Sequence, residues 1–479
     1  MCATTKMLQS CISLPLDEPQ LLDVVEKAKD WAIMHGAAMR SKQNFDQDAL
    51  LFAPFILTPS SFPRKEFQKA VELQPLLNEL IHSVAHDSQF LLTTLSSTEK
   101  VDEFTRSLIT IYRTVLDEGI AQTVTLALLR SDYLPNFSDA IKQVEINTIA
   151  SSFGGISTIM TPMHSYVLTE LGHQDKLVNL PENNALSGLC DAMVEAWKLQ
   201  ARSSAAILFV VEDVTYNICD QRFHEFYIRK AYPHVAVIRR TLTQISKTGK
   251  LGAGKELLID GTEASVVYFR AGYEPGHYYG QAEWDARLLI ERSVAIKCPS
   301  IQYHLAGTKK VQQALAKPEV LRRFVGDETK IEAIRDIFTG LYSLDQDEGG
   351  DEAMALALSD PERFVLKPQR EGGGNNVYGE DIPAALKAMS NEERSAWILM
   401  ERIFPPLSTG YMVRPNGPSP PPLVQLVSEL GIFGTIIGSK DNVLYNKQVG
   451  HMLRTKLSSS NEGGVAAGSG ALDSPYLID

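Results

Sequence analysis

Residues 364–380, FVLKPQREGGGNNVYGE, combine an apolar strand-like run, a lysine and three consecutive glycines. The ammonium group of Lys367 is a point charge suited to phosphate oxygens. Gly372 through Gly374 would let backbone N–H groups approach a phosphate without a Cβ in the way. The carboxylate of Glu371 fits such a cradle if a divalent cation lies between it and the phosphate. A surface glycine turn would have the same composition, so both interpretations stay open on this segment alone.

A second polar pattern occurs in 143-QVEINT-148. Strand alternation would place Val144 and Ile146 on one face, and Glu145 and Asn147 on the other. Two oxygen ligands at this spacing suit a hard cation such as Mg²⁺, and Glu371 could complete the site. The alternative is an exposed polar strand face without a metal.

Basic residues recur in three short phrases, 130-RSDYLP-135, 307-GTKK-310 and 450-GHMLRTK-456. An arginine can hold a substrate carboxylate through two parallel hydrogen bonds. Any one of these residues, taken singly, is more often a surface charge.

The segment 249-GKLGAGKE-256 matches the GxxxxGK pattern of a phosphate-binding loop. Such a loop needs Ser or Thr next, because that hydroxyl binds Mg²⁺. Glu256 stands there instead, and its carboxylate would repel phosphates. We therefore predict a glycine turn between two strands.

Composition limits the class of protein. The chain has 479 residues, 44% of them hydrophobic, with a net charge of −12 and a pI near 5.4. This length is enough for more than one domain, and the acidity argues against nucleic-acid binding. Five widely spaced cysteines without a CxxC pair argue against a zinc site or a disulfide framework. The N-terminal segment lacks an apolar signal core and no run reaches membrane-spanning length, so we expect a cytoplasmic protein, with a plastid pool as the alternative.

The elements that must position these residues follow a mixed α/β pattern. We predict helices through most of 17–130, with 101–130 as one or two helices, and then alternating strands and helices. Strands are predicted within 142–157, 205–214, 235–242, 257–273 (with a turn at Asp260-Gly261), 398–404 and 424–438, and helices at 309–325 and 382–397. We predict a solvated acidic loop over 345–353, a turn-rich linker over 414–422, and a Gly-, Ala- and Ser-rich tail over 457–475 that is either disordered or a mobile lid.

Taken together, the phrases VEINTIASSFGG, DQR, VVYFRAGY, LAGTKKVQQ, KPQREGGGNN, MERI, SELGIFG, GHMLRTK and GGVAAG resemble eukaryotic glutathione synthetase, in the family's order over about residues 125–475. The resemblance implies an α/β ATP-grasp fold with an inserted substrate-binding lobe and a helical N-terminal region. The implied division is 1–206 for the helical region and part of the core, 207–315 for the inserted lobe, and 316–479 for the ATP-grasp domain with its glycine-rich loop and C-terminal lid.

The resemblance also implies an activity, the ATP-dependent joining of γ-glutamylcysteine and glycine to glutathione through an acyl phosphate, with two Mg²⁺ ions and a homodimeric enzyme. The alternatives are a homoglutathione synthetase that uses β-alanine, another ATP-grasp carboxylate–amine ligase, and a nucleotide-binding regulator without turnover. ATP, γ-glutamylcysteine and glycine are the expected partners, with neither nucleic acid nor membrane.

Residue by residue, the resemblance implies metal ligands, nucleotide contacts, and dipeptide contacts with lid residues. Among them, Arg130, Arg454 and Lys367 are the expected catalytic residues. Metal ligands would be Glu145, Asn147 and Glu371. Nucleotide contacts would be Glu145, Lys309, Lys367, Pro368, Gln369, Arg370, Glu371, Gly372, Gly373, Gly374, Asn375, Asn376, Tyr378, Met400, Glu401, Arg402, Ile403, Glu429, Lys456 and Glu462. Dipeptide contacts and lid residues would be Arg130, Ile149, Ala150, Ser151, Ser152, Thr215, Tyr216, Asn217, Gln221, Arg270, Ala271, Gly272, Tyr273, Arg454, Val465 and Ala466.

Some positions depart from the family pattern. Ala150 stands where the family often has Ser, Ala271 where animal relatives have Asp, and Glu462 where an Asp is common. The RAGY phrase resembles the plant branch, whereas Ala466-Ala467 resemble the branch that uses glycine.

Overall fold

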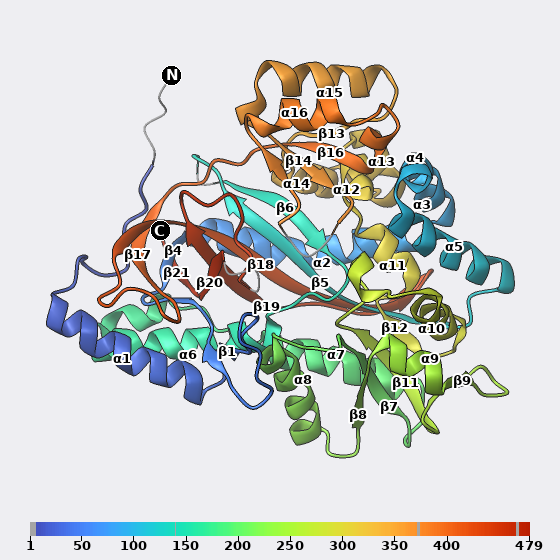
Figure 1. Ribbon diagram of the computed structural model, residues 1–479, viewed down its shortest axis with the longest axis horizontal. Coiled ribbons are helices and arrows are strands. Elements are labelled where there is room, and N and C mark those ends of the chain that lie inside the picture. Colours follow the sequence, from blue (N-terminus) through green and yellow to red (C-terminus); the bar gives the residue numbers. More distant parts are fainter. Residues whose placement is uncertain (1–5, 139, 371–373, 466–468) are drawn as a thin grey trace.

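The computed structural model describes residues 6–138, 140–370, 374–465 and 469–479. A long sheet runs through the middle of the molecule in the order β17-β3-β20-β19-β18-β5-β6 (Figure 1). Its neighbours pair antiparallel, except that β20 and β3 are parallel. The strands of this sheet are β3 (Phe55–Ile56), β5 (Thr125–Pro135), β6 (Ile141–Asn147), β17 (Ser408–Val413), β18 (Leu423–Ser439), β19 (Asn442–Leu457) and β20 (Gly470–Asp473).

Two further sheets flank the central one. The first has the order β8-β7-β11-β10-β9, with β12 on the other side of β11, and the second the order β13-β16-β14-β15. The first consists of β7 (Ala206–Val210), β8 (Ala236–Arg240), β9 (Gly249–Leu251), β10 (Leu257–Ile259), β11 (Thr262–Phe269) and β12 (Ile296–Cys298), and the second of β13 (Leu341–Ser343), β14 (Phe364–Pro368), β15 (Val377–Tyr378) and β16 (Trp397–Glu401). The pairs β1 (Ala38–Met39) with β2 (Leu51–Phe52), and β4 (Ser60–Pro63) with β21 (Pro475–Ile478), lie apart from these sheets.

Helices surround the three sheets, and none in the described part of the chain is long and apolar enough to cross a membrane. They are α1 (Glu18–Met34), α2 (Arg64–Ala85), α3 (Ser88–Thr94), α4 (Ser96–Val101), α5 (Glu103–Glu118), α6 (Gly154–Glu170), α7 (Ala185–Leu199), α8 (Ile218–Ala231), α9 (Leu242–Thr248), α10 (Gln281–Arg292), α11 (Ile301–Ala306), α12 (Lys309–Leu315), α13 (Pro318–Phe324), α14 (Glu328–Ile337), α15 (Glu348–Ser359) and α16 (Asp381–Ala388), with 3₁₀ turns at Gln174–Asn179, Pro275–His277, Pro361–Arg363 and Glu393–Ala396.

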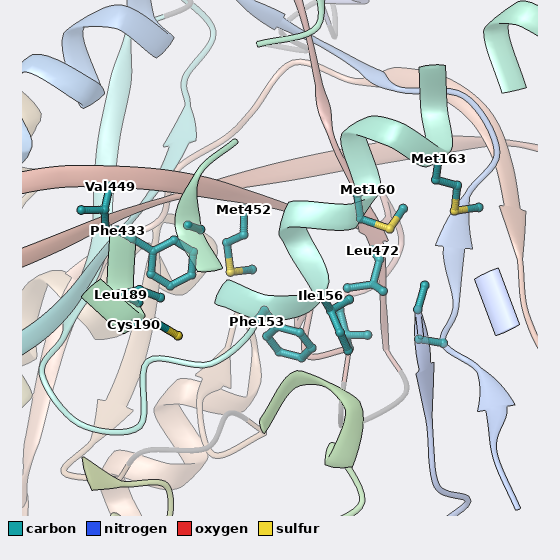
Figure 2. Close-up of a cluster of buried hydrophobic side chains, with 14 of the residues drawn as sticks. Phe153, Ile156, Met160, Met163, Leu189, Cys190, Phe433, Val449, Met452 and Leu472 are labelled. Carbon is teal, nitrogen blue, oxygen red and sulfur yellow. The ribbon is translucent and has the colours of Figure 1, made fainter. Parts of the chain in front are cut away.

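Helices cover both faces of the central sheet, and both faces carry apolar side chains. Along β18, Phe433 and Ile437 join the core under α6 and α7, whereas Ile432 and Ile436 join the core under α2. Figure 2 shows the first of these cores, where Phe433 and Met452 lie beside side chains of α6 and α7. Burial on both sides explains the continuous apolar sequence of this strand.

The mixed α/β class predicted from the sequence is confirmed, and so are two local predictions. Asp260 (φ 50°) and Gly261 (φ 81°) form the turn between β10 and β11. The GxxxxGK segment connects β9 to β10, and the Glu256 carboxylate accepts a hydrogen bond from the backbone N–H of Gly254 at 2.9 Å. That carboxylate therefore occupies the space in which a phosphate would have to lie.

Three local predictions are wrong. Helix α5 ends at Gly119 (φ 83°), and residues 125–130 belong to strand β5. A continuous apolar run suits a buried helix and a strand buried on both faces equally well, so periodicity did not separate them. The acidic loop is partly helical, since Asp347 caps α15 by accepting from the Gly350 N–H at 2.8 Å. The tail contributes β20 and β21, which pair in parallel with β3 and β4, two strands far away in the sequence that the tail's composition could not indicate.

The division of the chain at residues 206/207 and 315/316 stays a prediction. The middle segment, 207–315, contains almost all of the β7–β12 sheet. Strands β5 and β6 pair with each other, and β5 also pairs with β18, so the first and last segments share the central sheet.

Candidate active site

A cavity of about 480 Å³ has walls from the central sheet and from the β13-β16-β14-β15 sheet. Its lining includes most of the residues singled out in the sequence. These are Arg130, Glu145, Asn147, Ile149, Ala150, Ser152, Tyr273, Lys309, Lys367, Arg370, Asn375, Asn376, Tyr378, Met400, Glu401, Arg402, Ile403, Glu429, Arg454, Lys456, Glu462 and Val465.

Glu145 lies on β6 and meets two lysines in this cavity. The Lys309 Nζ is 3.6 Å from the Glu145 Oε2. Burial alone would raise the pKa of Glu145, but Lys309, Lys367 and two nearby arginines outweigh it and lower the pKa to about 2. The carboxylate is therefore ionised at any physiological pH.

The two lysines are held by backbone carbonyls from different parts of the chain. Lys367, on β14, donates from Nζ to the Val144 carbonyl on β6 at 3.1 Å. Lys309, at the start of α12, donates from Nζ to the Arg370 carbonyl at 2.9 Å. Each lysine thus connects the segment around 367–370 to another wall of the cavity, and their ammonium groups lie near the Glu145 carboxylate.

Two arginines form a second group with Asp132. Arg130 donates from Nε and Nη2 to the two Asp132 oxygens at 2.6 and 2.8 Å, and from Nη1 to the Ser152 carbonyl at 3.0 Å. The Arg454 Nη2 lies 3.7 Å from Asp132 and its Nε donates to Glu429 at 2.9 Å. Although burial opposes it, these carboxylates hold the pKa of Arg454 above its usual range.

Asp132 also orients Asn147, and neither the charge pattern nor the resemblance pointed to this residue. The Asn147 Nδ2 donates to the Asp132 Oδ2 at 3.0 Å. Asp132 lies within the 130-RSDYLP-135 phrase, two residues after Arg130 and on the same strand face. That spacing is the only sequence signal that could have identified it.

The segment after β19 meets the glycine-rich loop at the mouth of the cavity. Glu462 accepts from the Gly374 N–H at 2.6 Å, and the Tyr378 hydroxyl lies 3.5 Å from the same carboxylate. Arg402 lies over the Tyr378 ring, 5.9 Å from its centroid, and donates to the Asn461 side chain at 3.1 Å. Burial and the Glu462 charge raise the pKa of Tyr378 to about 12, so its hydroxyl stays protonated.

A strained turn follows β6 and enters α6. Ala150 and Phe153 both have positive φ, 48° and 73°. Asp220, on α8, holds this turn by accepting from the N–H groups of Phe153, at 2.9 Å, and of two residues at the start of α6. The buried Arg270 donates to Ser152 at 2.8 Å and to Asp220 at 3.3 Å. A non-glycine residue at positive φ costs free energy, which these buried contacts offset.

Other predicted site residues do not line this cavity. Ser151 donates to the Leu128 carbonyl at 3.2 Å, and Gln369 accepts from the Lys310 N–H at 3.1 Å. Gln221 accepts from Arg239 at 2.9 Å. Among the described residues, the predicted contacts Ser151, Pro368, Gln369, Gly374, Thr215, Tyr216, Asn217, Gln221, Arg270, Ala271 and Gly272 are not in the lining of this cavity. Glu371, Gly372, Gly373 and Ala466, with Ala467, lie outside the described residues.

The cavity lining also contains aromatic residues that sequence reasoning missed. The rings of Phe137 and Phe404 are stacked, with centroids 5.9 Å apart and an interplanar angle of 5°. Both side chains are partly exposed at the cavity, and Arg402 lies 5.5 Å from the Phe404 ring centroid. Isolated phenylalanines in loops carry no pattern that predicts this contact.

The donor set at Glu145 and Asn147 fits a magnesium ion. Glu145 is ionised, and Asn147 gives its NH₂ group to a carboxylate that can only accept, so its carbonyl oxygen points away from Asp132. Carboxylate and amide oxygens are ligands for this hard cation. In the described part of the chain, no group of three or more His, Cys, Asp or Glu is placed to hold a metal ion.

Comparison with known proteins agrees with this geometry. The profile of the family described as "Eukaryotic glutathione synthase, ATP binding domain" matches residues 18–477. The chain is 45% identical to the glutathione synthetase of Homo sapiens over 473 residues, 97% of this chain and 99% of the human one. It is 42% identical to the chloroplastic glutathione synthetase of Solanum lycopersicum over 437 residues, 90% of this chain and 78% of the tomato one. A solved glutathione synthetase-like effector from Globodera pallida, in its apo form, aligns with a TM-score of 0.78 and 26% identity, covering 97% of this chain and 98% of that one.

Proposed function

The chain belongs to the eukaryotic glutathione synthase family, and from this premise we propose which residues of the cavity do which part of the reaction. The chain is an ATP-dependent ligase that makes glutathione from γ-glutamylcysteine and glycine. The observation that carries the proposal is the meeting of Glu145, Lys309 and Lys367 with Arg130 and Arg454 in one cavity. Such a set can neutralise a polyphosphate and a carboxylate side by side.

The chemistry needs an activated carboxylate, because an ionised carboxylate does not react with an amine. The cysteinyl carboxylate of the dipeptide attacks the γ-phosphorus of ATP, which breaks the bond to the ADP oxygen and forms an acyl phosphate. The glycine amine then attacks the carbonyl carbon, a proton is lost from nitrogen, and phosphate leaves. Phosphoryl transfer depends on positioning and charge neutralisation rather than on a protein nucleophile, in keeping with a cavity lined by lysines, arginines and carboxylates.

Lysines and the glycine-rich segment are proposed to hold the nucleotide. Lys309 and Lys367 would neutralise phosphate oxygens, and Lys456 would extend this positive wall from the end of β19. Met400 through Ile403, at the end of β16, would line the purine end. Closure of the cavity mouth would keep water from the acyl phosphate.

Magnesium is proposed to bind at Glu145 and Asn147, with Glu371 as a third ligand. When bound, Mg²⁺ would neutralise negative charge on the phosphate oxygens during transfer. Glu145 suits this role because its low pKa keeps it ionised. Before the metal binds, the neighbouring lysines would balance the negative charge of Glu145.

The arginines are proposed to hold the dipeptide. Arg130 and Arg454 line the same cavity as the lysines, and Ser152 accepts hydrogen bonds from both Arg130 and Arg270. Thr215, Asn217 and Gln221, at the start of α8, would contact the γ-glutamyl end, and Val465 would contact the substrate from the tail. We further propose a homodimeric assembly and a cytoplasmic location. Plant relatives named as chloroplastic make a plastid pool the alternative location.

An ADP-release assay tests the proposal. The purified protein is supplied with ATP, Mg²⁺ and γ-glutamylcysteine, and with glycine or β-alanine as acceptor. We expect ADP release with glycine and the formation of glutathione by mass spectrometry. Faster turnover with β-alanine would overturn the acceptor assignment alone. Turnover only with a different acid and amine would overturn the glutathione assignment, and ATP binding without turnover would indicate a regulator.

A further inference from the structure

Asp132 lies between groups proposed to serve two different substrates. Its carboxylate accepts two hydrogen bonds from Arg130, at 2.6 and 2.8 Å, and one from the Asn147 amide at 3.0 Å. The Arg454 guanidinium lies 3.7 Å away. The side chain is only 1% exposed, so it is sealed behind these groups and does not itself face the cavity.

The carboxylate, with the Arg130 carbonyl that accepts from the Asn147 Nδ2 at 3.4 Å, sets which atom of Asn147 faces the cavity. An ionised carboxylate has no hydrogen to donate, so only the NH₂ group of Asn147 can point at it. The carbonyl oxygen of the amide must then turn to the opposite side, toward the proposed metal. A neutral amide in place of Asp132 would accept either orientation, because it carries both a donor and an acceptor.

The same carboxylate holds the two arginines close together. Arg130 and Arg454 are both nearly buried, and two guanidinium ions that lie near each other repel. Glu429 pairs with Arg454 at 2.9 Å, whereas Asp132 supplies both oxygens to Arg130. Loss of the Asp132 charge would leave the Arg130 guanidinium with the Ser152 carbonyl as its remaining hydrogen-bond acceptor among the described residues.

The opposite strand leaves room for this arrangement. Gly431, on the adjacent strand β18, pairs with Asp132 of β5. A Cβ at this glycine would lie 2.8 Å from the Asp132 Oδ1, 2.9 Å from the Arg130 Cδ and 2.7 Å from the Met452 Cγ. The Asp132–Arg130 pair therefore requires glycine at this point of β18.

We propose that Asp132 is a positioning residue that couples the metal side of the site to the dipeptide side. One carboxylate sets both the direction of the Asn147 oxygen and the place of the Arg130 guanidinium. This inference rests on the proposed function, because it takes Asn147 as a magnesium ligand and Arg130 as a dipeptide contact.

The test is the Asp132→Asn variant in the full chain, assayed for ADP release with γ-glutamylcysteine and glycine. The KM for the dipeptide and the half-saturating Mg²⁺ concentration should both rise, by roughly tenfold or more for the dipeptide and several-fold for Mg²⁺. The KM for ATP, measured at saturating Mg²⁺, should change by less than about twofold. Asp191→Asn is the matched control, because its carboxylate accepts from Tyr227 and Tyr232 away from the cavity, and all three constants should stay unchanged.

A second variant keeps the proposal testable if Asp132→Asn fails to fold. Gly431→Ala leaves every charge in place but forces the Asp132–Arg130 pair to shift, so it should raise the dipeptide KM in the same way. Gly410→Ala on β17 is its control, because the nearest atoms to its added Cβ are side-chain ends, Leu426 Cδ1 at 3.0 Å and Ile56 Cγ2 at 3.6 Å.

The measurements distinguish a positioning role of Asp132 from a purely structural one. Lower thermal stability and less active protein with unchanged dipeptide and Mg²⁺ constants would overturn the positioning role and leave a structural one. A rise in only one of the two constants would overturn the coupling. A parent protein that does not turn over γ-glutamylcysteine and glycine would overturn the proposed function instead. In that case, calorimetry would measure dipeptide binding to the parent and the variants. Weaker dipeptide binding by both Asp132→Asn and Gly431→Ala than by the parent would still support the contact between Asp132 and Arg130.

Discussion

The Lys309 Nζ lies 3.6 Å from the Glu145 Oε2, so a cation from α12 and an anion from β6 meet inside the cavity between the central sheet and the β13-β16-β14-β15 sheet. This pair joins groups of opposite charge at the place where a polyphosphate and its metal ion are proposed to bind. Lys309 balances the charge of Glu145. With the substrates bound, we propose that Lys309 would neutralise ATP phosphate oxygens and Glu145 would hold Mg²⁺.

Glu145→Gln removes the ionised ligand and keeps its shape. Since an amide holds Mg²⁺ more weakly than a carboxylate, we expect turnover to fall by about 100-fold or more and half-saturating Mg²⁺ to rise. A Mg²⁺ titration of ADP release measures both. Turnover close to that of the parent at ordinary Mg²⁺ would remove Glu145 from the metal site.

Arg454→Ala and Arg402→Ala should affect different substrates. Arg454 lies beside Asp132 and Glu429, on the proposed dipeptide side, whereas Arg402 lies over Tyr378 at the cavity mouth. We expect Arg454→Ala to raise the dipeptide KM by about tenfold or more, and Arg402→Ala to raise mainly the KM for ATP. Initial rates over both substrates give the two constants. The reverse pattern would exchange the two assignments.

Asp220→Ala should destabilise the fold strongly. It would leave Arg270 as a buried charge without its carboxylate and would remove the acceptor for three backbone N–H groups. Breaking a buried pair in this way costs about 3–5 kcal/mol in the free energy of unfolding. Urea unfolding measures it, with Glu328→Ala as the control. Glu328 pairs with Arg322 at the surface, with side chains 60% and 54% exposed, and its loss should leave the free energy of unfolding nearly unchanged.

The buried carboxyl group of Asp473 should make the stability of the fold depend on pH. Burial raises the pKa of this carboxyl from 3.8 to about 7, against hydrogen bonds from Thr455 at 2.6 Å and the Ser474 N–H at 2.8 Å. The protonated form is therefore the one that the fold prefers. Its stabilising contribution is complete below the unfolded pKa and is lost as the pH rises through about 7.

Asp473→Asn cannot ionise, so it should avoid this loss. Relative to the parent, its free energy of unfolding should rise by roughly 2 kcal/mol between about pH 5 and pH 8. Urea unfolding of both proteins at the two pH values checks the difference, and a difference that does not change with pH would contradict it.

The sequence predicted the chemistry of the site better than the contacts that hold it. Strand alternation in QVEINT put Glu145 and Asn147 on one face, and both line the cavity. Asp132 was missed because its importance lies in contacts with Asn147, on the neighbouring strand, and with Arg454, which is far away in the sequence. No local pattern reports the pairing register that brings such residues together.

The fold shows the same division between local and distant information. The turn at Asp260-Gly261 followed from two residues that accept positive φ. Strand β5 was mistaken for a helix. An apolar run fits both a buried helix and a buried strand, and the sequence does not show which distant strands it pairs with. The tail looked like a flexible segment by composition, yet Gly470–Asp473 pairs with β19 and meets β3.

The place of β20 in the central sheet has a consequence for how the protein is made. This strand lies between β3 and β19, and nearby the Asp473 carboxylate accepts from the Ser60 N–H, 413 residues earlier in the chain. During synthesis, the segment around Phe55 can pair with β17 only after residue 413 is made, and with β20 only after residue 472 is made. The sheet that carries the site is thus completed by a segment made long after β3, and a ribosome that stalls before Gly470 would release a chain with its central sheet open between β3 and β19.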